Sequence, residues 1–544
     1  MPNFDPITLQ VLWSRLVAGA DEMALTLEST AFSHVVRDNR DYACALYAAD
    51  GEMVAQAQVC APGQLGSMPR LLSQFLDVFP AETLQPGDVI ATNDPWVGSG
   101  HTPDFYVASP IFLDDALVGY AGCSAHHIDI GGRLAAPDAR EVYEEGVIVP
   151  ISMLYSANRP NEDIFKILQR NVRMSDKMIG DLRAQVAANH VGARRVQELM
   201  RDRGLQSLDA VSQDILSLTE QRTRRAIAEV PDGTYTSGFE LEDADATGNP
   251  LEIQAAICVQ GDEMAIDYAG TSPQVDLPIN CVENFTLAHT MFAVKCLLGL
   301  DLPFNSGCFA PIRITAPDGS LLNARFPAAC MWRTDVAMCL PEVIFEALGA
   351  ALPERVMAPS GSYPLWLTIL AGQTDSGEPF VAHFNASGGQ GAMATRDGHS
   401  TTVFPGTITN TPVEMMETEA PVVFERKSLR TDSGGAGSHR GGLGQDVVIL
   451  SLARAPITAT VVGGRYRKGP NGYAGGGSGA TGAISVNDGQ PFERARQVHL
   501  ELGDRLNLQY PGGGGYGTPG GRDTESIDRD VVEGLVSAER AKHG

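Results

Sequence analysis

Histidine and carboxylate side chains are concentrated in two short motifs, residues 93–104 and 124–132. Three of the 11 histidines in the chain lie in these motifs, beside three aspartates. The side chains there that could do chemistry are His101, Asp104, His126, His127 and Asp129. Imidazole and carboxylate together form the ligand set of divalent cations such as Zn, Mn and Fe. The cluster therefore predicts a metal-dependent function, whereas a single loop histidine would more often only cap a turn.

The first motif is expected to form a loop that leads into a strand. His101 and Asp104 are three residues apart, which would place them on one face of a helix. Pro103 and the preceding glycines disfavour a helix at this point. A turn can bring both side chains inward, so we expect them on a loop that enters a strand at residues 105–108.

The second motif follows a predicted buried strand. The apolar run 116–123 is typical of such a strand, and His126 and His127 lie at its carboxyl end. Adjacent strand residues point to opposite faces. We therefore expect one of the two histidines to bind metal, while the other serves in catalysis or orients a ligand.

The remaining pattern predicts an α+β protein of several domains with mixed sheets. Apolar residues recur at helical spacing over residues 6–36, 68–79 and 161–228. Strand-like alternation follows residue 231, and glycine is dense from residue 434 onward. We expect an α/β segment with the metal-like site at 1–158, a helical insertion at 159–230, a β-rich domain at 231–460 and a glycine-rich β region at 461–544. The apolar stripe of 161–228 and the glycine-rich tail are expected to be buried against another chain.

Composition excludes several classes of partner. The net charge of -26 opposes binding to nucleic acid or to an anionic membrane, whose phosphates would be repelled. The nine cysteines are an odd number without C-x-x-C spacing, which indicates reduced thiols and no disulfide framework. Because no apolar run approaches the length of about 20 residues that a membrane span needs, we expect a soluble, cytoplasmic protein.

Other apparent motifs are expected to be structural. Residues 477–482 match a dinucleotide-binding fingerprint, but they follow a glycine run and not a strand. No G-x-x-x-x-G-K-S/T motif and no G-x-S-x-G elbow occur, which disfavours a Walker-type ATP site and a serine hydrolase. The glycine segments 388–391 and 434–437 could bind anions but more often form tight turns. Cys123 precedes His126, yet a buried cysteine in an apolar strand is usually inert.

Two motifs, Asn93-Asp94-Pro95-Trp96 with His101-Thr102-Pro103-Asp104 and His126-His127-Ile128-Asp129-Ile130-Gly131-Gly132, resemble those of a known family. Further matches occur at residues 40–46, 66–69, 145–146, 412–417, 429–437 and 512–519. Together they are similar to the hydantoinase B family over nearly the whole chain. That family contains the second subunits of ATP-dependent hydantoinases, 5-oxoprolinases and related lactamases. It also contains subunits of acetone and acetophenone carboxylases, so the resemblance identifies no single substrate.

The resemblance implies a division of labour with a larger, hydantoinase A-like subunit in a hetero-oligomer. The partner would bind ATP and phosphorylate the carbonyl oxygen of a small cyclic amide. This chain would supply the site where the activated intermediate is consumed. An amide carbon is a poor electrophile, and phosphorylation of its oxygen makes it a far better one.

The resemblance also assigns roles to individual residues. Matching the family motif makes His101, Asp104 and His126 the ligands of a divalent transition metal, Zn, Mn or Fe. His127 or Asp129 would be the catalytic base or would orient a ligand. Asp41 is a further candidate ligand or base, and a purely structural role at the start of a strand is equally compatible with its position.

Three functions remain open from the sequence. The first is an ATP-dependent amidohydrolase that opens a hydantoin, oxoproline or other lactam ring. The second is a subunit of an ATP-dependent ketone carboxylase, but the chain lacks the long extensions associated with the acetone carboxylase subunit. The third is a non-catalytic scaffold for the ATP-binding partner, which the clustered histidines and carboxylates disfavour.

Overall fold

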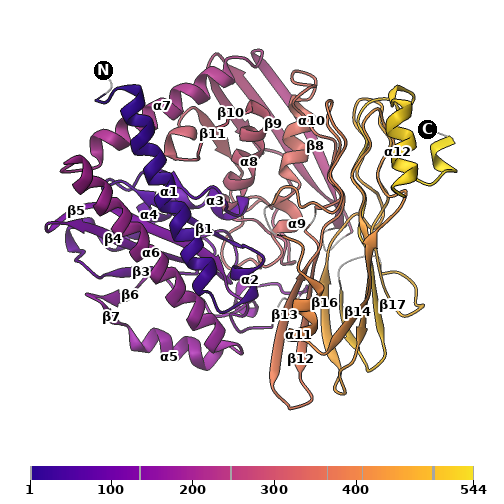
Figure 1. Ribbon diagram of the computed structural model, residues 1–544, viewed down its shortest axis with the longest axis horizontal. Helices are drawn as coiled ribbons and strands as arrows, with labels where there is room; N and C mark the ends of the chain where they lie inside the picture. Colours follow the sequence, from indigo (N-terminus) through magenta and orange to yellow (C-terminus); the bar gives the residue numbers. More distant parts are fainter. Residues whose placement is uncertain are drawn as a thin grey trace.

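The computed structural model of the protein describes residues 3–133, 137–244, 248–363, 365–406, 409–492 and 496–542. Figure 1 shows an amino-terminal half that combines helices with sheet, and a carboxyl-terminal half built mainly of strands. The prediction of an α+β protein with mixed and antiparallel sheets is confirmed. Among the described residues, no helix is both long and apolar enough to cross a membrane.

The first sheet has seven strands in the order β2-β1-β5-β4-β3-β6-β7, and all neighbouring strands are antiparallel. Its strands are β1 Tyr42–Tyr47, β2 Met53–Gln56, β3 Val89–Thr92, β4 Asp104–Leu113, β5 Ala116–His126, β6 Ser152–Ser156 and β7 Arg159–Pro160. The helices around it are α1 Pro6–Thr30, α2 His34–Arg37, α3 Pro62–Leu65, α4 Met68–Val78, α5 Glu162–Asn171, α6 Ser175–Arg203 and α7 Asp209–Ile227.

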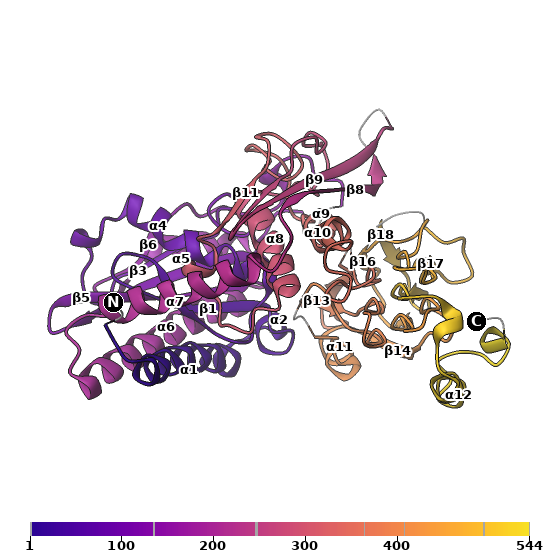
Figure 2. The same ribbon diagram turned by 90° about the horizontal axis from the view of Figure 1, so that it is seen from above.

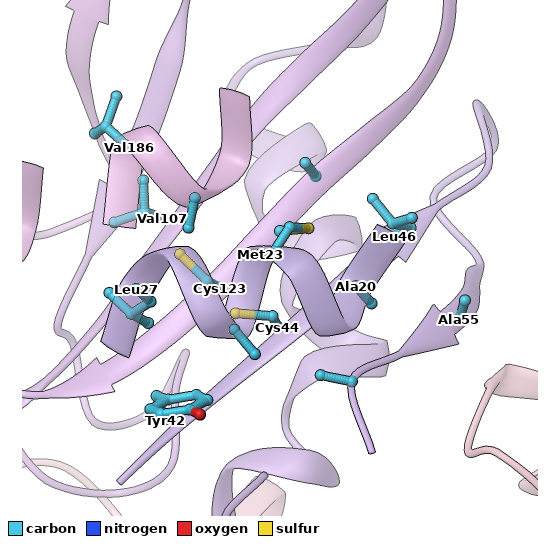
Figure 3. Close-up of a cluster of buried hydrophobic side chains, with 14 of the residues drawn as sticks. Ala20, Met23, Leu27, Tyr42, Cys44, Leu46, Ala55, Val107, Cys123 and Val186 are labelled. Atoms are coloured by element: carbon cyan, nitrogen blue, oxygen red, sulfur yellow. The ribbon is translucent and has the colours of Figure 1, made fainter. Parts of the chain in front are cut away.

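Both faces of this sheet are buried, each under different helices. Figure 2 shows α1 and α6 along one side of the sheet and α4 on the other. On the α1 side, Met23 and Leu27 pack toward Cys44 of β1 and Cys123 of β5, as Figure 3 shows. On the other side, α4 covers the alternate residues of the same strands. Because strand side chains alternate between faces, the face of each site residue follows from its position in the strand.

The first helix is shorter than its apolar pattern predicts. Helix α1 begins where the Asp5 carboxylate accepts the main-chain N–H groups of Ile7 and Thr8, each at 3.1 Å. The predicted end near residue 36 is wrong, since the helix ends at Thr30. Beyond it, Asp181 of α6 accepts the main-chain N–H groups of Phe32 and Ser33. This tertiary contact turns the chain where local periodicity would have continued the helix.

The helical stretch after residue 160 is buried within its own chain. Phe165 and Leu168 of α5 and Met178 and Leu182 of α6 belong to the hydrophobic core beneath the first sheet. The expectation that this stripe is buried against another chain is therefore wrong. Helices α5–α7 share a hydrophobic core with strands of the first sheet, β1–β6. The predicted domain boundaries at residues 158, 230 and 460 stay a prediction.

The middle of the chain adds a smaller sheet. Its order is β11-β10-β9-β8, with β10 and β11 parallel and the other pairs antiparallel. The elements here are β8 Gly233–Ala244, β9 Pro250–Gln260, β10 Glu263–Asp267, α8 Glu283–Leu298, β11 Ile312–Thr315, α9 Thr334–Ala337 and α10 Leu340–Leu348. Helices α8 and α10 pack against each other and share a core with this sheet.

Two four-stranded antiparallel sheets in the carboxyl-terminal half share a hydrophobic core and form a sandwich. One contains β12 Leu367–Gln373, β13 Pro379–Asn385, β16 Ile457–Val462 and β18 Arg496–Leu500. The other contains β14 Val422–Leu429, β15 Gln445–Ser451, β17 Ala483–Val486 and β19 Arg505–Gln509. Helix α11 Val413–Glu419 lies beside β13 and β14, and α12 Thr524–Val532 lies near the chain end (Figure 1). Single-turn helices complete the fold at η1 Ala81–Thr83, η2 Val142–Glu144, η3 Ser306–Cys308, η4 Pro519–Gly521 and η5 Arg540–Lys542.

Glycine-rich segments of the carboxyl-terminal half contact one another through their main chains. The N–H of Gly389 donates to Pro511 O and that of Gly435 to Gly513 O, both at 2.9 Å. A Cβ atom at Gly389 would lie 1.8 Å from the carbonyl oxygen of Gly442. The absence of a side chain at these glycines allows two main-chain segments of the protein to lie close together. The sequence had suggested tight turns as the role of these glycines.

Candidate metal centre beside an apolar cavity

The strand register of the first sheet brings three candidate residues together at one end of neighbouring strands. Asp104, the first residue of β4, lies opposite His126, the last residue of β5. The N–H of His126 donates to the carbonyl oxygen of Asp41, immediately before β1, at 3.0 Å. Residues 22 or more positions apart therefore meet because antiparallel strands place the start of one beside the end of the next.

His101, Asp104 and His126 form a compact triad of ligand atoms. His101 Nε2 lies 2.9 Å from Asp104 Oδ1. His126 Nδ1 lies 3.1 Å from that oxygen and 3.2 Å from His101 Nε2. Ligand atoms bound at about 2.1 Å to one cation are about 3 Å apart at usual coordination angles. The three residues therefore fit a divalent metal ion, as their residue types predicted.

The other polar atoms of two ligands are held by separate partners. Asp104 Oδ2 accepts hydrogen bonds from the Ser99 hydroxyl and from Arg333 Nη2, the latter at 3.1 Å. Nδ1 of His101 is 3.4 Å from Met331 O. A proton on this Nδ1 would leave Nε2 free to bind a cation. Such partners fix the orientation and the tautomer of metal ligands.

Burial and nearby charges keep two of the triad residues in their metal-binding forms. Burial, with Arg333 nearby, lowers the pKa of His101 to about 3, so its imidazole is neutral at neutral pH. Burial tends to raise the pKa of Asp104, but His101, His126 and Arg333 outweigh it and hold that pKa well below its usual range. A neutral imidazole and an ionised carboxylate are the states that bind a cation.

Asp41 lies beside the triad. Its Oδ2 is 3.8 Å from His126 Nδ1, and its Oδ1 accepts a hydrogen bond from Gln64 Nε2 at 3.1 Å. Burial is the main cause that raises the pKa of Asp41 to about 6. A carboxylate in this position can complete the ligand set or accept a proton near it, and its role stays a prediction.

The polar contacts of His127 and Asp129 lead away from the triad, and His127 Nδ1 has no hydrogen-bond partner among the described residues. His127 Nε2 is 3.0 Å from Gln185 Oε1 of α6, and its ring packs edge-on against Phe105. Asp129 accepts the N–H groups of Gly131 and Arg173, at 3.0 and 2.5 Å. The two adjacent histidines do point to opposite faces, as strand geometry requires. The catalytic roles predicted for His127 and Asp129 stay untested, and both residues contribute to the wall of the adjacent cavity.

A cavity of about 120 Å³ adjoins the triad. Apolar side chains from the middle and carboxyl-terminal parts of the chain form much of its wall. They include Phe285, Met331, Met338, Leu365, Leu367, Ile369 and Val403. The triad therefore faces a small, largely apolar chamber that could hold a compact organic ring.

Four polar residues of the cavity wall were missed by sequence reasoning. They are Glu145, His289, Arg333 and His383, each buried and each with one polar atom that has no hydrogen-bond partner among the described residues. Burial lowers the pKa of His289 to about 3 and holds that of His383 well below its usual range. The contact of Arg333 with Asp104 spans 229 positions, so no local pattern could reveal it. Glu145 lay within a family-like match but carried no predicted role.

Comparison with known proteins identifies relatives across the chain. The family model described as hydantoinase B/oxoprolinase matches residues 5–519. The caprolactamase subunit beta of Pseudomonas jessenii is 32% identical over 100% of this chain and 96% of its own. The crystal structure of ATP-dependent caprolactamase from that organism matches with a TM-score of 0.92 and 30% identity, over 99% of this chain and 96% of that one.

Two further comparisons bear on partner and fold. The 5-oxoprolinase of Saccharomyces cerevisiae is 30% identical over 95% of this chain, but the match covers only 42% of the yeast protein. An acetone carboxylase structure matches with a TM-score of 0.86 at 19% identity, over 99% of this chain and 79% of that one, which shows a shared fold alone.

Proposed function

This chain belongs to the hydantoinase B/oxoprolinase family, and we propose that it is the metal-binding, hydrolytic subunit of an ATP-dependent cyclic amidohydrolase. The substrate would be a hydantoin, oxoproline or other lactam ring. The observation that carries the proposal is a buried His101, Asp104 and His126 triad that opens on a small, largely apolar cavity.

ATP is assigned to a partner subunit. The related caprolactamase is described as ATP-dependent and its matching chain as a subunit beta. The match to yeast 5-oxoprolinase leaves more than half of that longer protein outside the aligned part, which gives room for a separate ATP-binding unit. The sequence carries no Walker motif. A hydantoinase A-like partner would therefore phosphorylate the carbonyl oxygen and deliver the activated ring to this chain.

The residues of the site divide the work of hydrolysis. His101, Asp104 and His126 would hold a divalent cation, Zn, Mn or Fe. When bound, such a cation lowers the pKa of a coordinated water toward neutrality and so supplies a nucleophile. Arg333 holds Asp104 in its ionised, binding orientation through the 3.1 Å contact. Asp41, with a pKa of about 6, would take the proton that the attacking water releases.

The largely apolar wall of the cavity would protect the activated intermediate. Apolar side chains such as Leu367 and Val403 limit the access of bulk water, which would otherwise consume a reactive phosphorylated amide. The buried thiols of Cys44, Cys123 and Cys281 are free, which agrees with a cytoplasmic complex. We propose that the complex is a hetero-oligomer of this chain with its ATP-binding partner.

The test is reconstitution with the partner subunit. The purified pair should form ADP and a ring-opened product from at least one member of a panel of lactams and hydantoins, whereas each chain alone should be inactive. Parallel assays with ketones, with and without bicarbonate, distinguish the carboxylase. Bicarbonate-dependent carboxylation of a ketone without any ring opening would contradict the proposal. If ATP cleavage by the partner requires this chain but not its triad, the result would favour a non-catalytic scaffold function of this chain.

A further inference from the structure

Glu145 lines the same cavity and comes from a different part of the chain than the triad. It follows the single turn η2, is only 3% exposed and lines the cavity wall. Its main-chain oxygen accepts a hydrogen bond from the Thr102 hydroxyl at 3.1 Å. Since Thr102 is next to His101, the Glu145 loop is tied directly to the loop that carries the triad.

The two oxygens of Glu145 have different surroundings. Oε1 accepts the main-chain N–H groups of Cys330 and Met331, each at 2.7 Å. Oε2 is buried and has no hydrogen-bond partner among the described residues. Two N–H donors occupy Oε1, so a proton on the neutral acid must sit on Oε2. The neutral form therefore holds an O–H group that no atom of the described residues accepts.

Burial favours the neutral form of Glu145, against the effect of most of its polar neighbours. Burial is the largest influence and raises the pKa of Glu145 to about 8. The two N–H donors and the Arg333 guanidinium act in the opposite direction, whereas Glu144 adds to the rise. The Cys330 thiol is itself uncharged, because burial raises its pKa well above the usual range. At neutral pH the residue is therefore a carboxylic acid.

Hydrolysis of a phosphorylated amide needs such an acid at one step. Addition of a water oxygen to the activated carbon gives a tetrahedral carbon that bears hydroxyl, phosphoryloxy and ring nitrogen. If the phosphate leaves first, the C–O bond to it breaks, the lactam forms again and ATP has been wasted. If the ring nitrogen is protonated, the C–N bond breaks instead. An acyl phosphate with a free amine results, and its hydrolysis yields the ring-opened acid and phosphate.

We propose that Glu145 is the proton donor to the ring nitrogen and so directs the tetrahedral intermediate toward ring opening. This inference rests on the proposed amidohydrolase function. The Oε2–H bond breaks as the N–H bond forms, and the electron pair of the breaking C–N bond becomes the lone pair of the leaving amine. The hydroxyl of the tetrahedral carbon releases its proton to water as the carbonyl of the acyl phosphate forms, and the Glu145 carboxylate recovers a proton from water before the next turnover.

The decisive variant is Glu145→Gln in the complex of both subunits, with caprolactam as the probe. Glutamine keeps an acceptor for the Cys330 and Met331 N–H groups but has no acidic proton. Ring opening should fall by about 100-fold or more, while ADP formation continues. In heavy-oxygen water the recovered caprolactam should gain heavy oxygen, because loss of phosphate leaves the water oxygen in the re-formed carbonyl. Glu144→Gln, a neighbour outside the cavity wall, should keep wild-type coupling.

Other outcomes separate this inference from the proposed function. If wild-type enzyme opens no ring in the panel, the proposed function fails and takes the inference with it. If wild-type enzyme opens caprolactam and Glu145→Gln does so with unchanged rate and ADP ratio, only the inference is overturned. The inference is also overturned if ring opening and ADP formation fall together in Glu145→Gln and the recovered lactam carries no heavy oxygen.

A measurement independent of any variant is the wild-type pH profile, in which the ADP formed per ring opened should rise above about pH 8, the pKa of Glu145. A flat ratio through this range would overturn the inference.

Discussion

Asp104 and Arg333 form a buried ion pair, with Arg333 Nη2 3.1 Å from Asp104 Oδ2, although they lie 229 positions apart. The pair connects the first sheet to the loop before α9. The Arg333 guanidinium also lies over the Phe285 ring, 4.1 Å from its centroid. The candidate metal-binding carboxylate of Asp104 is thus oriented by a segment whose neighbouring residue Trp332 belongs to a different hydrophobic core from Phe105.

This relationship predicts the effect of removing the guanidinium. In Arg333→Met, Asp104 keeps its position in the strand and the Ser99 hydroxyl at Oδ2, but it loses the charged partner of that oxygen. We expect the affinity for Zn to fall by about 10- to 100-fold, the usual effect of losing an orienting contact. Competition with a chelator measures the dissociation constant. Arg325→Met, which removes an exposed pair with Asp318, is the matched control and should leave it unchanged.

A second prediction concerns substrate charge. The carboxyl groups of Asp41, Asp104 and Glu145 line the cavity, and its only guanidinium among the described residues is already paired with Asp104. Arg333 Nη1 has no partner among the described residues, but a substrate carboxylate would have to share this guanidinium with Asp104 and would lie near the other carboxyl groups. We therefore expect pyrrolidone to be opened with a kcat/KM about 100-fold above that of 5-oxoproline, which carries the same ring with a carboxylate. Equal or reversed values in parallel assays of the complex would contradict this assignment of the cavity.

A third prediction separates the two adjacent histidines. His127→Ala should keep the wild-type metal content, because His127 Nε2 contacts Gln185 Oε1 at 3.0 Å and does not contact the triad. The variant should lose about 1–3 kcal/mol of stability, since a buried Gln185 oxygen is left without that partner. Elemental analysis and thermal unfolding test the two parts. Loss of metal from His127→Ala alone would show that this residue is a ligand.

A fourth prediction tests the glycine-rich segments. A Cβ at Gly512 would lie 1.8 Å from the carbonyl oxygen of Ser433, so Gly512→Ala must displace main chain and should destabilise the fold by about 1–3 kcal/mol. At Gly520 no atom lies within 4 Å of such a Cβ, and Gly520→Ala should be tolerated. The thermal unfolding midpoints of the two variants, compared with wild type, provide the measurement. Equal midpoints would contradict the close packing.

The sequence predicted those parts of the site that depend on local spacing. His101 with Asp104, and His126 with His127, were found because each pair is adjacent to a strand whose apolar pattern is visible. The sequence did not predict Arg333 and Glu145 as site residues, because their contacts join distant segments of the chain. The end of α1 was misplaced for the same reason, since Asp181 of α6 and not the local sequence turns the chain. The close approach of Gly389 to Gly442 could not be inferred, because glycine runs specify no partner.

Metal content tests the central claim most directly. Elemental analysis of the purified chain should find close to one transition metal ion per chain, and His101→Ala or Asp104→Ala should abolish it, because two remaining triad ligands hold such an ion too weakly. The same variants should abolish ring opening in the complex. An Asp104→Ala protein that keeps a full complement of metal, or opens lactams at the wild-type rate, would contradict the account.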